Sequence, residues 1–184
     1  MKGINRSALV FSRVLEVLHW ILAAVMAVVS VGAATDGGWL SSLIKTILPE
    51  GGVELSTYGF EVLVADSAGN INMTTVFLFS IGAVIIISLM AMSFRNVHLI
   101  LRKTKDSTPF QKDNIRMLRE IGIFNIAVPI VGIIMSIIIR AVIGVDDVEA
   151  SVQMGGLVTG VLILCLTQFF AYGMELENDV GGLL

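Results

Sequence analysis

Four long apolar blocks constrain the fold of this chain more than any other feature of its sequence. Polar segments separate them, and they cover residues 14–34, 73–92, 121–139 and 154–172. A helix needs about 20 apolar residues to cross roughly 30 Å of hydrocarbon, and each block meets that length. Strands of a membrane barrel would be shorter and would alternate polar with apolar residues, which these blocks do not. The sequence therefore predicts an all-α membrane protein, a bundle of four transmembrane helices.

The composition agrees with this class. Of the 184 residues 55% are hydrophobic and 15% are charged, whereas a soluble domain carries about 25% charged residues. The single cysteine, Cys165, lies in the fourth block, so no intrachain disulfide can form. With their polar ends included, the spans are expected at about 14–34, 73–101, 115–140 and 153–174 of a single domain, residues 1–184.

A cleaved signal peptide is the alternative for the first block, because Val31-Gly32-Ala33 resembles a cleavage site. Its apolar stretch is longer than a usual signal core, and three further blocks follow. We therefore expect the first helix to stay in the mature protein.

The charges separate by segment and predict the orientation. Ten of the 12 basic residues either precede the first span or lie around the connection between the second and third: Lys2, Arg6, Arg13, Arg95, Arg102, Lys103, Lys105, Lys112, Arg116 and Arg119. Residues 35–72 hold one cation, Lys45, and five acidic residues. Lys and Arg near helix ends stay on the cytoplasmic side. The sequence thus predicts a multi-pass protein of a bacterial inner membrane with both termini cytoplasmic and residues 35–72 as an extracytoplasmic loop.

This loop has local patterns of its own. Apolar residues recur at helical spacing from Trp39 to Leu48, and Pro49 ends the pattern, which predicts a short amphipathic helix. Two alternating runs around Tyr58-Gly59 then predict a β-hairpin. Because two strands alone are marginally stable, this hairpin needs to pack on the helix ends or on a partner.

The inner segment before the third span carries a capping pattern. Thr108 can serve as N-cap, Pro109 suits the first helical position, and Gln111 can reach back to the cap. This predicts that the third helix begins near Pro109 and continues unbroken into the membrane. Its first turns are basic.

Glu16 and His19 are the candidate functional polar pair, since their spacing puts them on one face of the first span. Ionisable groups inside spans often mark function, here a proton or ion role. A Glu-x-x-His unit also occurs in di-iron bundles, which need two copies. This sequence has one copy of the Glu-x-x-His unit. His98 and Glu120 are expected at a similar depth, so a metal or haem site remains an alternative. The alternative is structural, with the pair bonded to each other or to Arg95.

Other polar and small residues have two interpretations each. The inner cations form a predicted surface for anionic lipid headgroups or for a cytoplasmic partner: Arg102, Lys103, Lys105, Lys112, Arg116 and Arg119. Arg140 is expected to pair with Asp146, Asp147 or Glu149. The strip Gly156-x-x-x-Gly160 favours close helix packing within the bundle, or between protomers of a homo-oligomer.

A short pattern in the middle of the chain resembles a known family. It begins with Thr108-Pro109-Phe110 and continues with Asn114, Arg116, Leu118, Arg119, Ile121 and Gly122. It is similar to the bacterial YoaS-like family of small four-span membrane proteins, a domain of unknown function. The stretch 169–179, aromatic and then acidic, resembles the family ending, and Val180-Gly181-Gly182 departs from it mildly. Because members often sit beside a gene for a small helix-turn-helix DNA-binding regulator, the resemblance implies a membrane partner in signalling. It carries over no catalytic, cofactor or ligand residue.

The motifs of common enzymes are missing from the sequence, including a phosphate loop, a nucleophile elbow and a metalloprotease motif. We therefore expect no catalytic residue, no metal and no cofactor. One hypothesis is a non-enzymatic sensor or anchor that binds the lipid bilayer and a cytoplasmic DNA-binding regulator, without binding nucleic acid itself. The other is a small transporter or ion-handling protein that uses Glu16 and His19. Three spans nearly free of ionisable residues favour the first.

Overall fold

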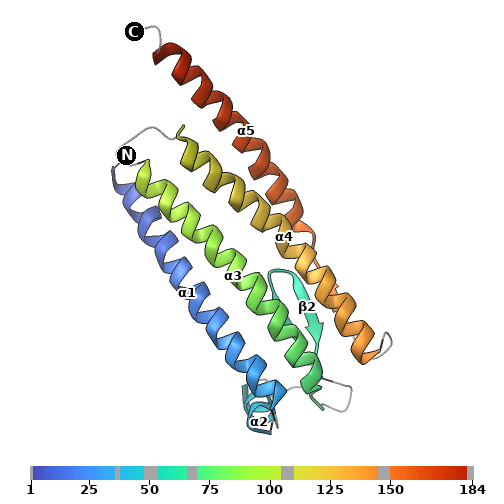
Figure 1. Ribbon diagram of the computed structural model, residues 1–184. Helices are drawn as coiled ribbons and strands as arrows, with labels where there is room; N and C mark the ends of the chain where they lie inside the picture. The colour runs from blue at the N-terminus through green and yellow to red at the C-terminus, as the bar shows by residue number, and fades with distance from the viewer. Residues whose placement is uncertain are drawn as a thin grey trace. The chain divides into compact units, whose positions relative to one another are not determined.

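The computed structural model describes residues 2–35, 38–47, 54–65, 70–104, 110–144 and 150–181. Within them, the structure confirms the predicted fold class (Figure 1). The helices are α1 (Lys2–Ala34), α2 (Gly38–Ile47), α3 (Met73–Lys103), α4 (Lys112–Ile143) and α5 (Gly155–Gly181). By length and composition α1, α3, α4 and α5 can each cross a membrane. The strands are β1 (Glu54–Thr57), β2 (Phe60–Leu63) and β3 (Ala150–Val152).

The chain packs as two compact units. The first, here called the α5 unit, comprises Met1–His19, Leu89–Ala127 and Gly155–Leu184. The second, here called the sheet unit, comprises Trp20–Ser88 and Val128–Met154. It follows that α1, α3 and α4 contribute residues to both units, whereas α5 belongs to the first and α2 and the strands to the second.

The predicted amphipathic helix and hairpin both form in the sheet unit. On α2, Leu40 is fully buried while Trp39 stays half-exposed. β1 and β2 pair antiparallel, with Thr57 opposite Phe60 at the turn. The two turn residues have positive φ, 48° at Tyr58 and 79° at Gly59. Two consecutive residues with positive φ suit a tight hairpin, because that backbone matches the twist of the flanking strands.

A third strand, which was not predicted, completes the sheet. β3 pairs antiparallel with β2, with Phe60 opposite Val152 and Val62 opposite Ala150. The Arg140 guanidinium donates from Nη2 to the Ala150 carbonyl oxygen at 2.7 Å and so holds the start of this strand. The three acidic residues predicted as partners of Arg140 lie outside the described residues. A third strand gives the hairpin the support that two strands lack.

The apolar face of the sheet packs against α3 and α4. Phe60 is almost fully buried, and its ring stacks on Phe79 of α3 with centroids 5.2 Å apart. Two glycines make room for it: a Cβ on Gly82 of α3 would stand 3.1 Å from the Phe60 ring, and one on Gly132 of α4 would stand 3.4 Å from the Phe60 Cβ. β2 is therefore packed tightly against both helices.

The predicted start of the third helix, near Pro109, is wrong by about three residues. α4 begins at Lys112, and its first turn is closed by the Ile115 N–H donating to the Gln111 carbonyl oxygen at 3.0 Å. Gln111 therefore occupies the N-cap position, while Thr108 and Pro109 lie outside the described residues. The Phe110 ring packs against Phe170 of α5, with centroids 5.5 Å apart. This tertiary contact places Phe110 outside the helix, against the local capping pattern. From Lys112 the helix then runs unbroken through Pro129 to Ile143.

Candidate functional site

The predicted basic surface lies in the α5 unit, at the end of α3 and the start of α4. Arg102, Lys103, Lys112, Arg116 and Arg119 are all exposed, and Lys105 lies outside the described residues. Two of these cations have acidic partners: Lys103 with Asp113 at 2.7 Å, and Arg116 with Glu120 at 3.7 Å.

Other cations of this unit form no ion pair within 4.0 Å among the described residues: Arg6, Arg95, Arg102, Lys112 and Arg119. Exposed cations of this kind contribute a positive potential that attracts anionic groups. This surface can bind phosphates of lipid headgroups or carboxylates of a protein.

The predicted pair Glu16 and His19 lies on a buried polar face of α1, together with Ser12. Glu16 accepts a hydrogen bond from Arg13 at 2.6 Å; its side chain is 7% exposed, whereas that of Arg13 is 57% exposed. The His19 ring is 4.8 Å from the Phe94 ring of α3. Because a carbonyl oxygen only accepts, the 2.7 Å contact of His19 Nδ1 with the Leu15 oxygen assigns the proton to Nδ1. Arg95, named above as an alternative partner, is exposed.

Hydrogen bonds join α3 to both of its neighbours in this unit. His98 Nδ1 donates to the Leu9 carbonyl oxygen of α1 at 3.0 Å. Asn96 donates from Nδ2 to Glu120 of α4 at 2.9 Å. His98 and Glu120 were considered above as further metal ligands. His98 instead joins α3 to α1, and Glu120 joins α4 to α3. Within the described ranges, no three His, Cys, Asp or Glu residues come close enough to hold a metal ion. Asn96 was not predicted as a functional residue, although the sequence places its amide two residues before His98.

The small-residue strip of α5 serves internal packing at Gly160. A Cβ there would stand 2.7 Å from the Gly122 carbonyl oxygen of α4, and one on Gly122 would stand 3.1 Å from the Gly160 oxygen. The two backbones therefore touch, as small residues allow in membrane helices.

Glu61, one of the five acidic residues of the segment 35–72, forms a polar centre on the sheet. It lies on β2 and accepts hydrogen bonds from Ser151 at 3.0 Å and Gln153 at 3.2 Å. The Gln153 N–H also donates to the Gly59 oxygen at 2.8 Å. At the same turn, partial burial raises the pKa of the Tyr58 phenol, so this side chain is neutral at physiological pH. The sheet presents a polar face that is held by its own hydrogen bonds.

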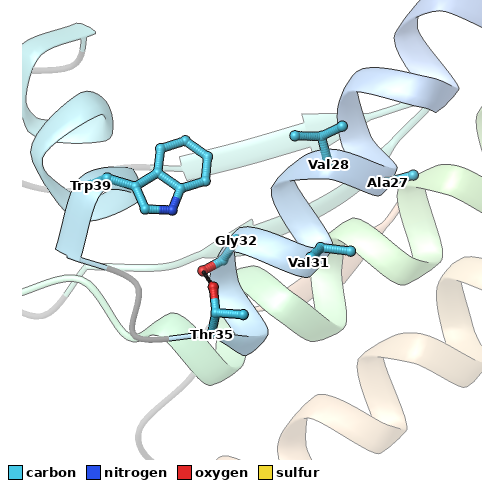
Figure 2. A pocket seen from close by; sticks show the side chains of 6 residues that line it. All are labelled: Ala27, Val28, Val31, Gly32, Thr35 and Trp39. Atoms are coloured by element: carbon cyan, nitrogen blue, oxygen red, sulfur yellow. Dashed lines mark hydrogen bonds between the residues drawn. The ribbon is translucent and has the colours of Figure 1, made fainter.

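A shallow apolar pocket of about 400 Å³ lies between α1 and α2 in the sheet unit (Figure 2). It is lined by Ala27, Val28, Val31, Gly32, Thr35 and Trp39. The Trp39 indole lies directly over Gly32, where any Cβ would collide with the ring. Thr35 donates from Oγ1 to the Gly32 carbonyl oxygen at 3.1 Å. Apart from the Thr35 hydroxyl and the Trp39 indole N–H, the side chains that line the pocket are apolar.

No family model, curated protein or solved structure matches this chain. The resemblance to the YoaS-like family therefore stays a prediction.

Proposed function

We propose that the protein is a non-enzymatic sensor or anchor of a bacterial inner membrane that binds a cytoplasmic regulator. The observation that carries the proposal is that α3 and α4 each take part in two surfaces. In the sheet unit, Phe60 packs against Gly82 of α3 and Gly132 of α4. In the α5 unit, the same helices carry the exposed cations Arg102, Lys112 and Arg119.

Tight packing supports a signalling role for these helices. Because Phe60 lies close to Gly82 and Gly132, a shift of β2 would press on α3 and α4. Packed helices respond to such pressure by translations of about 1–2 Å, which is a recurring mode of switching. A movement of this size would rearrange the cations at the other ends of α3 and α4 and change how they bind an acidic partner.

The direction of the signal follows from the charge distribution. The cations of the α5 unit are assigned to the cytoplasm, together with both termini, and the sheet to the outside. The identity of the partner, a small helix-turn-helix DNA-binding regulator, rests on the resemblance to the YoaS-like family.

Ion or proton handling is the second candidate, because Glu16 and His19 are both buried on one face of α1. Buried ionisable residues in a span are functional candidates by default. However, Arg13 neutralises Glu16 and the Leu15 carbonyl accepts from His19. These bonds within α1 support a structural role for both residues and so favour the regulator hypothesis.

The experiment compares Lys112→Glu/Arg119→Glu with Lys45→Glu, a control that reverses an exposed cation of α2. Membranes containing equal amounts of each variant are solubilised and the variant is purified. The regulator that copurifies with it is then identified and quantified by mass spectrometry. We expect recovery to fall for the double variant, and wild-type recovery to fall at high salt, because exposed charges are screened within about 8 Å at physiological ionic strength. Unchanged recovery would contradict the proposal, and loss of ion flux in Glu16→Gln would favour the second candidate.

A further inference from the structure

One face of α5 is exposed at a regular spacing. Val158, Val161, Cys165, Gln168 and Tyr172, here called the α5 seam, follow one another at steps of three and four residues, and all are exposed. This spacing matches the a and d positions of a heptad, the pattern by which two helices pack along a seam. The opposite face of α5 is used within the α5 unit, where Gly160 contacts α4 and Phe170 contacts Phe110.

Gln168 is the residue that acyl chains cannot satisfy. It is exposed within the candidate span Gly155–Glu177. At about 1.5 Å of rise per residue it lies about 20 Å from Gly155 and about 6 Å from Tyr172, the last residue of the apolar block. Among the described residues, none is a hydrogen-bond partner of its amide. A polar group left unsatisfied in hydrocarbon is unfavourable, so a hydrogen-bond partner from another chain would stabilise this side chain.

We infer that the α5 seam binds a second copy of this chain, with Gln168 hydrogen-bonded to Gln168 of that copy. A carboxamide has both a donor and an acceptor, so two copies of it are complementary to each other. Two copies in one membrane have the same orientation, and a two-fold axis along the membrane normal makes their α5 helices parallel. Each seam residue then faces its own counterpart.

The ends and flanks of the α5 seam fit this pairing. The next position of the pattern is Glu175, and further acidic residues follow, so like charges limit the contact to the part up to Tyr172. Beside the seam, Leu162 and Phe169 are 60% and 71% exposed. They add apolar area at the edge of the contact, where coiled coils place flanking residues.

A comparison with α1 shows why exposure alone is insufficient. The apolar window of α1 is also largely unburied, with 17% of its residues inside the structure against 11% for α5. From Ile21 to Val31, however, the exposed residues of α1 are all apolar, and acyl chains cover them without an unmet hydrogen bond. The amide of Gln168 distinguishes α5. The inference does not depend on the proposed function.

The natural sequence already contains the probe, because Cys165 is the single cysteine and lies at the middle of the α5 seam. In a parallel pair, counterpart residues at a seam position approach to a Cα–Cα distance compatible with a disulfide, about 4.4–6.8 Å. We expect copper–phenanthroline, a membrane-permeant oxidant, to link wild-type chains in native membranes into a dimer of twice 19.8 kDa. A reducing agent should reverse the link, and Cys165→Ser should abolish it.

Matched variants then map the contact. In the Cys165→Ser background, Val161→Cys and Tyr172→Cys should restore crosslinking. Leu166→Cys should not, since this exposed neighbour of Cys165 points about 100° away around the helix. Equal crosslinking at position 166, no crosslinking at any seam position, or a link to a protein of another mass would each overturn the inference.

A second measurement tests the amide itself without relying on crosslinks. Energy transfer between labelled chains in liposomes, followed as lipid is added, measures dimer dissociation. We expect Gln168→Leu to weaken association by about three- to tenfold, the effect of one interhelical hydrogen bond in a membrane, while Gln168→Asn retains most of it. Circular dichroism would verify that both variants keep their helices. Unchanged association in Gln168→Leu would refute the role of Gln168.

Discussion

Phe60 anchors the sheet to α3 and α4, so its truncation is the sharpest test of how the sheet unit is stabilised. The side chain is 1% exposed and stacks on Phe79 at 5.2 Å. Truncation of a buried phenylalanine to alanine costs about 3–5 kcal/mol, because apolar contacts are lost and a cavity remains. The loss of the aromatic pair places the expected value in the upper part of this range.

We therefore expect Phe60→Ala to lower the free energy of unfolding by about 4 kcal/mol. Trp39 reports on the sheet unit, so denaturant titration in detergent micelles can be followed by its fluorescence in a Trp20→Phe background. Leu43→Ala is the control: this residue is half-exposed on α2, and surface substitutions change stability by about 0.5 kcal/mol or less. A loss in Phe60→Ala no larger than in Leu43→Ala would refute the anchoring role.

The same reasoning predicts coupling between Phe60 and Gly82. A methyl group on Gly82 would lie 2.9 Å from the Met135 Cγ and 3.1 Å from the Phe60 ring. Gly82→Ala should therefore destabilise the protein by about 1–3 kcal/mol through overpacking. With Phe60→Leu present, part of that loss should disappear, since the smaller side chain leaves room. Strictly additive losses would argue against direct contact between the two residues.

Three further predictions concern single contacts. Gly160→Ala should lower the free energy of unfolding by about 1–3 kcal/mol, because its methyl group would press on the α4 backbone. Gly155→Ala, with open space around it, should change the free energy of unfolding little, and thermal unfolding of both variants measures the difference. Gly32→Ala should displace the Trp39 indole and shift its emission in the Trp20→Phe background, while Gly38→Ala, also in open space, should leave the spectrum unchanged. The Asn72 Oδ1 caps α3 by accepting hydrogen bonds from the N–H groups of Thr74 and Thr75. Asn72→Ala should therefore lower the free energy of unfolding by about 1 kcal/mol, while Asn72→Asp should preserve it; denaturant titration measures both variants.

The elements that the sequence predicted correctly depend on local patterns. The length of an apolar block decides whether it can form a membrane-spanning helix, and the spacing around Trp39 decides which face of α2 is apolar. The hairpin turn was likewise readable at Tyr58-Gly59, because glycine favours positive φ. Each of these patterns involves neighbours in the chain.

The candidate site was only partly readable from the sequence. The charge count located the cations of α3 and α4 as a group, but which of them remain unpaired depends on whether an acid from another turn or helix lies within reach. Lys103 finds Asp113 across two helices at 2.7 Å, whereas Arg102 beside it has no acidic partner among the described residues. Similarly, Glu16 and His19 were found from their spacing, but their partners Arg13 and the Leu15 carbonyl required a structure.

Contacts between distant residues decided the rest. β3 has three residues, too few for a periodic signal, and it forms because β2 offers an edge and Arg140 holds Ala150 in place. α4 begins at Lys112 because Phe110 packs against α5 instead of continuing the helix, a choice that the Thr108–Gln111 pattern could not reveal. Local propensities differ by a few tenths to about 1 kcal/mol per residue, and the packing of a half-buried aromatic side chain such as Phe110 can outweigh them.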